Sequence, residues 1–147
     1  RIKSCRCPRS VSGMKKTKLQ PKSKTTKAQL IRQCDALWSK YVRRNKKCEW
    51  CGSPCKDAHH MVARRRSAYL RHHPANGVAL CSGCHYRFHN HESRTGWQKF
   101  AEQRPADLKF LESEMNKTHR LGLPYYREKL EELKSLTKTT GGNNDNS

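Results

Sequence analysis

Apolar side chains recur every three or four positions between Lys27 and Arg44, and basic side chains occupy the opposite face of this stretch. The spacing is typical of an amphipathic helix that buries one face. Cys34 falls on the apolar face, so we interpret it as a small buried hydrophobe and not as a metal ligand. The apolar positions are Leu30, Ile31, Cys34, Leu37, Trp38, Tyr41 and Val42.

Three more helical patterns follow within residues 93–138. Pro105 and Pro124 each open an apolar stripe, and proline is favoured in the first turn of a helix. A shorter pattern around Trp97 and Phe100 precedes them. These helices are nearly neutral overall, so we expect a packing or partner-binding module, through which a second copy of the chain or another protein could bind.

The middle of the chain follows a different pattern. No helical stripe fits residues 48–80, which instead hold short strand-like runs and turns. One run precedes a basic loop, and a second, residues 78–80, follows the turn dipeptide Asn76-Gly77. A helical segment over residues 81–90 comes next. Strands that return beside flanking helices predict an α+β fold.

Length and composition limit the architecture further. The chain has 147 residues, of which 33% are hydrophobic, so we expect one compact domain without a large apolar core. Metal binding is a usual support for small domains of this kind. We expect a flexible basic arm (1–26), a helix with the central segment (27–92), the helical module (93–138) and a disordered tail (139–147).

The charge indicates the class of partner. The formal net charge of +20 favours a polyanion, with nucleic acid ahead of an acidic membrane surface. Residues 91–147 contribute only +1 of this excess. Lys15 and Lys16 in the basic arm are candidate phosphate contacts. No apolar run approaches the roughly 20 residues of a membrane span, and no secretory signal pattern is visible, so we expect an intracellular protein.

Two Cys-x-x-Cys pairs favour a structural zinc site. A two-residue gap lets both sulfurs of a pair face one ion, and four thiolates suit tetrahedral zinc. Cys55 follows four residues after Cys51 and stays an alternative ligand in its place. Disulfides are disfavoured because nothing marks the chain as secreted, and the role of Cys5 and Cys7 stays open. The predicted ligands are Cys48, Cys51, Cys81 and Cys84.

Histidines form a second candidate site in the same segment. His59 and His60 are adjacent in a strand-like run, whereas His85 and His89 lie one helical turn apart, where both imidazoles can face one ion. Neighbouring strand residues point to opposite faces, so the doublet can serve one site only where the strand ends or bends. Asp57 is either a hydrogen-bond acceptor in the zinc knuckle or a metal ligand, and we favour the first interpretation. The histidines expected at the surface are His72, His73, His91 and His119.

The order of these motifs resembles the ββα-metal (His-Me finger) HNH endonucleases. The zinc-stapled branch of that family is similar through both Cys pairs, and the colicin-type DNases are similar through the His doublet. The match covers residues 48–89, under a third of the chain, and includes Asn76 between the doublet and the helical pair. More distantly, the preceding helix and residues 71–84 resemble phage-encoded HNH proteins, among them the Rap/NinG recombination nucleases of lambdoid phages.

The resemblance implies a zinc-stapled ββα-metal core and a nuclease that hydrolyses DNA phosphodiester bonds to 5′-phosphate and 3′-hydroxyl ends. It implies that His60 is the general base, and that Asn76 braces the loop and orients His60. Many members have Asp where this chain has His59, which leaves the ion open among Mg²⁺, Mn²⁺, Ni²⁺ and Zn²⁺. The implied ligands of this catalytic ion are His59, His85 and His89. The candidate phosphate contacts are Arg64, Arg65, Arg66, Arg71 and Arg87.

Two other functions stay open on the sequence. A non-catalytic zinc-finger DNA-binding or recombination-mediator protein would use the four cysteines and the basic arm, but it gives no reason for the ordered histidines. A packaging or assembly factor would act through the C-terminal helices. For a phage-encoded nuclease, the resemblance implies branched DNA as the substrate and the bacterial host cytoplasm as the location.

Overall fold

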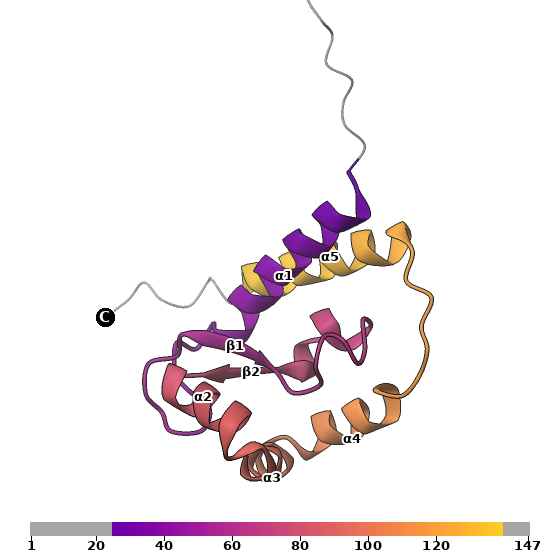
Figure 1. Ribbon diagram of the computed structural model, residues 1–147. Coiled ribbons are helices and arrows are strands. Elements are labelled where there is room, and N and C mark those ends of the chain that lie inside the picture. The colour runs from indigo at the N-terminus through magenta and orange to yellow at the C-terminus, as the bar shows by residue number, and fades with distance from the viewer. Residues whose placement is uncertain (1–24, 140–147) are drawn as a thin grey trace, which may run out of the picture.

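The computed structural model describes residues 25–139, which form five α-helices around a two-stranded sheet (Figure 1). The predicted α+β class is confirmed, and each predicted helical stripe forms a helix. Two short 3-10 helices, η1 and η2, lie between the strands. The elements are α1 (Lys27–Val42), β1 (Asp57–His60), η1 (Leu70–His72), η2 (Pro74–Asn76), β2 (Gly77–Leu80), α2 (Ser82–Asn90), α3 (Ser93–Gln103), α4 (Pro105–Glu114) and α5 (Leu123–Thr139).

A capping box begins α1. The Thr26 hydroxyl accepts a hydrogen bond from the backbone N–H of Gln29 at 3.3 Å, and the Gln29 side chain accepts one from the Thr26 N–H at 2.8 Å. These two bonds satisfy backbone donors that the first helical turn leaves free. The apolar face of α1 is buried, and Cys34 is 0% exposed, which confirms its predicted place in the core.

The antiparallel pair β1–β2 divides the apolar interior in two. His60 at the end of β1 lies opposite Gly77 at the start of β2. Alternate residues of a strand face opposite ways, so the buried strand β2 supplies both cores. Val78 and Leu80 join the core formed with α2, α3 and α4, whereas Ala79 joins the core of α1 and α5. The sheet thus lies between two helical layers (Figure 1).

The three C-terminal helices pack into different cores. α5 lies beside α1, and its residues Tyr126, Leu130 and Leu133 are buried there. α3 and α4 extend the other core through Phe100 and Leu111. The stretch that the sequence groups as one module therefore covers both faces of the sheet.

One surface prediction is wrong. His72 in η1 is 0% exposed, because its Nε2 donates a hydrogen bond to Asp35 of α1 at 2.8 Å and α1 covers it. His91 is exposed as expected, whereas His73 and His119 are partly buried against aromatic rings. The basic, polar sequence around His72 conceals this contact, which joins residues far apart along the chain.

The close approach of α1 to β2 predicts that Gly77 accepts no side chain. A Cβ there would lie 2.9 Å from Trp38 Cζ2 and would collide with Val42 Cγ2. We expect Gly77→Ala to lower the free energy of unfolding by about 1–3 kcal/mol, the usual cost of overpacking. Urea unfolding followed by circular dichroism measures the change. Gly122→Ala is the control, since its Cβ would come no closer than 3.4 Å to Pro124; equal losses in the two variants would contradict the packing argument.

Candidate metal centres and active site

Four cysteine sulfurs converge at the start of α2. Cys48 and Cys51 lie in the knuckle after α1, and Cys81 and Cys84 frame the first turn of α2. The four Sγ atoms lie within 4.8 Å of one another. The sulfurs of Cys51 and Cys81 are 3.6 Å apart, and tetrahedral ligands at a Zn–S distance of about 2.3 Å would be about 3.8 Å apart. The group could therefore hold a metal such as zinc.

Backbone hydrogen bonds shape the first knuckle. The Cys48 N–H donates to the Ser53 carbonyl at 2.7 Å, and the Gly52 N–H donates to the Cys48 carbonyl at 2.9 Å. Gly52 has a φ of 73°, which glycine adopts without steric cost. Cys55, the alternative ligand, lies outside the group, and its Sγ donates to the Asp57 carbonyl at 3.6 Å.

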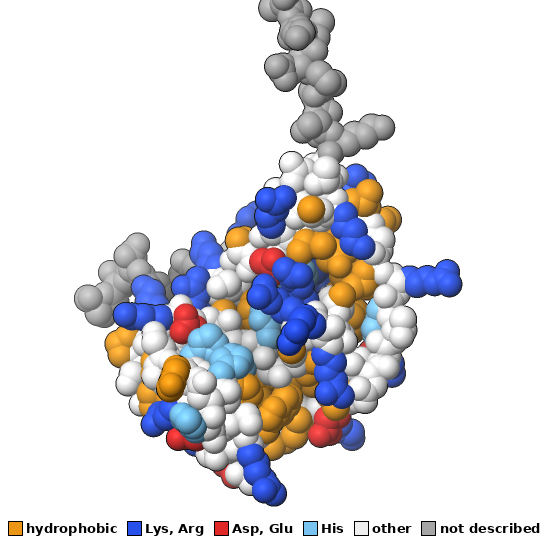
Figure 2. Space-filling model, viewed as in Figure 1, with side chains coloured by type: hydrophobic (Ala, Val, Ile, Leu, Met, Phe, Trp, Pro, Cys, Tyr) orange, Lys and Arg blue, Asp and Glu red, His pale blue; other side chains and the backbone are white. Residues whose placement is uncertain are grey.

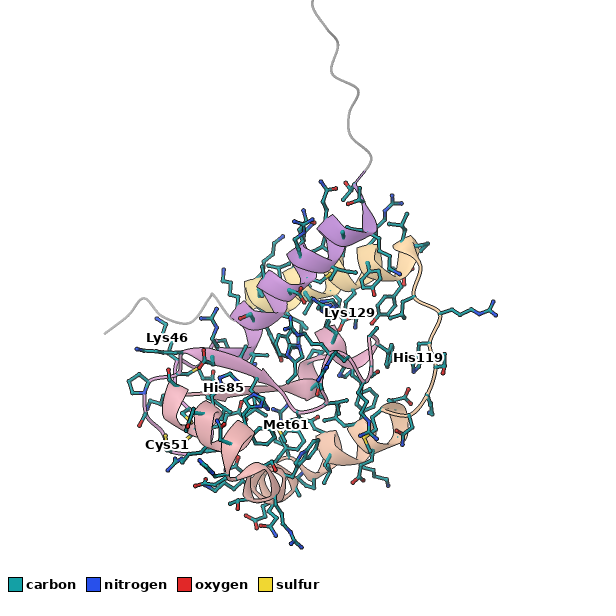
Figure 3. The ribbon with its side chains drawn as sticks, viewed as in Figure 1. Lys46, Cys51, Met61, His85, His119 and Lys129 are labelled. Carbon is teal, nitrogen blue, oxygen red and sulfur yellow. The ribbon has the colours of Figure 1, made fainter. Side chains whose placement is uncertain are left out.

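Three imidazoles form a second group, built from His59 of β1 and from His85 and His89 of α2. Their ligand nitrogens lie within 4.8 Å of one another. The Nε2 atoms of His85 and His89 are 3.2 Å apart, close to the roughly 3 Å expected for imidazoles that share one ion at about 2.1 Å. His59 is 4% exposed, and its Nε2 has no hydrogen-bond partner among residues 25–139. A buried nitrogen without a partner, beside two others, fits a metal ligand. Figure 3 shows His85 where α2 meets the sheet.

The surroundings suit these imidazoles to bind a metal. The carboxylate of Asp57 accepts a hydrogen bond from His85 Nδ1 at 3.1 Å, which leaves the His85 Nε2 lone pair for the group. Asp57 therefore serves the histidines and not the cysteine knuckle, contrary to the sequence prediction, because the start of β1 lies beside α2. Burial, followed by repulsion from His85 and His89, lowers the pKa of His59 to about 3. His59 thus stays neutral, the form that binds metals.

His60 points the other way, toward α1. Its ring stacks on Trp38, with centroids 3.9 Å apart and planes at 15°. Its Nε2 lies 2.9 Å from the Arg71 carbonyl oxygen, and because a carbonyl only accepts, the ring proton is on Nε2 and Nδ1 is the basic nitrogen. Burial lowers the pKa of His60 to about 4, although the bond to the Arg71 carbonyl opposes this shift.

The end of β1 brings the two histidines to one cavity. His59 and His60 face opposite sides of the strand, but His60 is its last residue, so both line a cavity of about 620 Å³. His85 and His89 line the same cavity from α2. Figure 2 shows exposed histidines close to a cluster of Lys and Arg side chains on this face. The predicted condition, that the doublet can serve one site where the strand ends, is met.

Asn76 braces the connection between the strands. Its side chain is buried, and its Oδ1 accepts from the Val62 N–H at 2.6 Å. Its Nδ2 donates to the carbonyls of Val62 and Leu70, each at 3.0 Å. The Asn76 carbonyl accepts from the N–H of Met61, the residue after His60, at 3.0 Å. Asn76 thus acts on the backbone next to His60 and not on its ring.

The predicted phosphate contacts have different surroundings. Arg64 and Arg65 line the cavity, whereas Lys15 and Lys16 lie outside the described residues. Arg64 and Arg65 are therefore the predicted cations that the structure brings to the histidines.

Within residues 25–139, no helix is both long and apolar enough to cross a membrane.

The other three arginines contact protein groups. Arg66 donates to an asparagine side chain after α4 at 2.9 Å. Arg87 donates to the sulfur of Cys84 at 3.2 Å. Arg71 forms a two-pronged ion pair with Asp35, at 2.7 and 2.8 Å. Arg71 thus binds a residue that lines the histidine cavity, and Arg87 binds one of the four clustered cysteines.

Two residues of the site escaped the sequence analysis. Asp35 and Trp38 lie on the side of α1 that lines the cavity. The sequence pattern predicts Trp38 only as part of the apolar stripe, because its contact with His60 leaves no signal in the sequence. Asp35 does leave a signal in the sequence, because it is the single acidic residue between Lys27 and Arg44.

The cysteine group predicts a chain that retains about one zinc ion. We expect Cys51→Ser to lose this zinc and to unfold at lower temperature, since structural zinc contributes to folding free energy. Mass spectrometric metal analysis and thermal unfolding measure the two effects. Every variant also carries His89→Ala, which weakens metal binding by the histidine group. Cys55→Ser is the matched control and should keep the metal. Zinc retained by both variants, or lost by both, would contradict the assignment.

Comparison of the chain with protein-family models, curated proteins and solved structures finds no significant match. These comparisons therefore neither support nor oppose the resemblance seen in the motifs. A functional proposal for this chain must depend on the geometry of its own side chains.

Proposed function

We propose that this protein is a metal-dependent endonuclease that hydrolyses DNA phosphodiester bonds to 5′-phosphate and 3′-hydroxyl ends. The observation that carries the proposal is one cavity lined both by the three-imidazole group and by His60, whose Nε2 lies against the Arg71 carbonyl so that Nδ1 is its basic nitrogen. A purely structural metal site gives no reason for that separate base. The order of the motifs, which resembles the HNH endonucleases, supports the same function.

His60 is suited to accept a proton from the attacking water. The Arg71 carbonyl fixes its tautomer and Trp38 fixes the plane of its ring, so Nδ1 has one orientation. Its lowered pKa, about 4, keeps the imidazole neutral near neutral pH. A phosphate bound in the cavity would raise this pKa toward neutrality, because a nearby negative charge favours the imidazolium.

His59, His85 and His89 would hold one divalent ion. Such an ion supplies Lewis-acid stabilisation of negative charge on the phosphate and on the leaving oxygen. The chain contributes the neutral state of His59, through burial, and the orientation of His85, through Asp57. Imidazole ligands suit Ni²⁺ and Zn²⁺ better than Mg²⁺, so we propose a transition metal as the better activator.

Arg64 and Arg65 would bind the phosphate. Both line the cavity, and a guanidinium pairs with two phosphate oxygens at once. The net charge of +20 would attract DNA over a longer range. We propose branched DNA, as in recombination, as a preferred substrate on the strength of the phage-type resemblance alone.

A non-catalytic zinc-dependent DNA-binding protein is the second candidate. The four cysteines and the positive charge favour it as strongly as they favour a nuclease. With the cysteine site alone, it leaves unexplained why the buried His59 Nε2 has no partner among residues 25–139 and why His59 faces two further imidazoles. The nuclease accounts for both.

The first test is the loss of plasmid cutting in His60→Ala. We expect the rate to fall at least about 100-fold, within the usual contribution of a general base. Supercoiled plasmid is incubated with Mg²⁺, Mn²⁺, Ni²⁺, Co²⁺ or Zn²⁺, and nicked and linear products are quantified. His91→Ala is the matched control, because His91 is exposed and does not line the cavity.

Two outcomes would contradict the assignment. Undiminished cutting by His60→Ala would exclude His60 as the base. DNA binding without cleavage in any of the five ions would favour the non-catalytic alternative. Four-way, flap, nicked and plain duplex substrates, compared with the active ion, test the branched-DNA proposal, which equal cutting of plain duplex would oppose.

A second prediction concerns the arginines at the cavity. We expect the Arg64→Ala, Arg65→Ala double variant to raise the KM for DNA and to weaken the salt dependence of binding, because two phosphate contacts are lost. The kcat should change less than the KM. Arg43→Ala, Arg44→Ala is the control of equal charge, at the end of α1 and away from the cavity lining. Equal effects of the two pairs would show general attraction and no specific contact.

A further inference from the structure

We propose that Asp35 of α1 is a positioning residue for the base His60, acting through Arg71 and His72 of η1; this role rests on the proposed nuclease function. The Asp35 carboxylate binds the Arg71 and His72 side chains, and the Arg71 backbone carbonyl accepts the hydrogen bond from His60 Nε2. We call Asp35, Arg71 and His72 the α1 clamp.

Three hydrogen bonds make up the α1 clamp. Asp35 Oδ1 accepts from Arg71 Nε and from His72 Nε2, each at 2.8 Å, and Oδ2 accepts from the Arg71 terminal nitrogen at 2.7 Å. Burial alone would raise the pKa of Asp35, but the bonds from His72 and Arg71 hold it well below its usual range. Asp35 is therefore ionised at neutral pH, and the bonds are charge-assisted.

The clamp holds the segment that orients His60. η1 is a three-residue 3-10 helix, whose own hydrogen bonds are weak and few. The direction of the Arg71 carbonyl therefore depends on what anchors residues 71 and 72 from outside. Asp35 anchors both side chains, and the buried His72 leaves little room for a shift.

The same face of α1 holds His60 from a second side. Trp38, one helical turn after Asp35, stacks on the His60 ring, and its Nε1 donates to the His73 carbonyl at 3.0 Å. Helix α1 thus holds residues 71–73 and the plane of the base together. Because the Nε2–H of His60 is tied to this segment, its Nδ1 is available to water.

The test compares Asp35→Asn with Asp107→Asn in the full chain. Asn keeps the shape of Asp35 but turns one acceptor into a donor that faces Arg71 or His72. Asp107 is a matched control: it pairs with Arg104 at 2.6 Å, has similar exposure (36% against 30%) and lies outside the cavity. Steady-state cleavage is measured well below both unfolding temperatures.

We expect Asp35→Asn to lower kcat by about 10- to 100-fold, the range for a misplaced catalytic group, with KM changed less than threefold. Asp107→Asn should keep the wild-type kcat. A fall in kcat of equal size in both variants, or none in Asp35→Asn, would overturn the proposal. If Asp35→Asn fails to fold, Arg71→Lys serves instead. It keeps the charge but loses the two-pronged pair, so we expect a smaller fall in kcat at unchanged KM; an unchanged kcat would overturn the proposal.

A second readout does not depend on cleavage. Long-range ¹⁵N–¹H NMR of the imidazoles reports which nitrogen carries the proton. Wild-type His60 should be protonated on Nε2, and Asp35→Asn should show a mixture of tautomers. An unchanged tautomer would overturn the positioning role. If the wild type cuts no DNA with any ion, the proposed function fails, and the tautomer alone decides whether Asp35 positions His60.

Discussion

The alternation of side chains along β1 is the constraint on which the site depends. Two strands of four residues cannot form a stable sheet alone. Helices therefore cover both faces, α1 and α5 on one side and α2 to α4 on the other. Because successive residues of β1 face opposite layers, His59 meets α2 and His60 meets α1. A register slip by one residue would exchange the two histidines, so the packing that fixes the register also assigns their surroundings.

Helix α2 connects the cysteine and histidine groups. Cys81 and Cys84 frame its first turn, and His85 and His89 follow on the same helix. A metal held by the four sulfurs would fix the start of α2 against the first knuckle and so direct the two imidazoles toward β1. The two histidines of β1 differ in their surroundings: His59 is almost fully covered and neutral, whereas the Nε2 of His60 lies against the Arg71 carbonyl and its ring lines the cavity.

Spacing along the chain predicted the parts of the structure that are local. In each of these parts the members are only a few residues apart in the sequence, so backbone geometry decides which side chains meet. They are the helical stripe around Cys34, the cysteine pairs of the two knuckles, and the i, i+4 pair His85 and His89. Asp35 and His72 meet across 37 positions, and no short-range pattern predicts such a contact. A basic, polar loop predicts surface positions, but a hydrogen bond to Asp35 of α1 gives His72 the partner that its burial requires.

Asp35 also poses an electrostatic problem, because it is the single acidic one among the described residues that line the cavity. An unpaired carboxylate there would repel the phosphate that, under the proposed function, Arg64 and Arg65 would attract. Both Asp35 oxygens are instead occupied by donors from η1, and the positive charge of Arg71 compensates its own. Arg71 therefore serves this site by neutralising Asp35 and by offering its carbonyl to His60, and it need not contact DNA to do either. A charged clamp of this kind would fix the geometry of the proposed base inside a strongly basic surface without weakening the attraction of that surface for a polyanion.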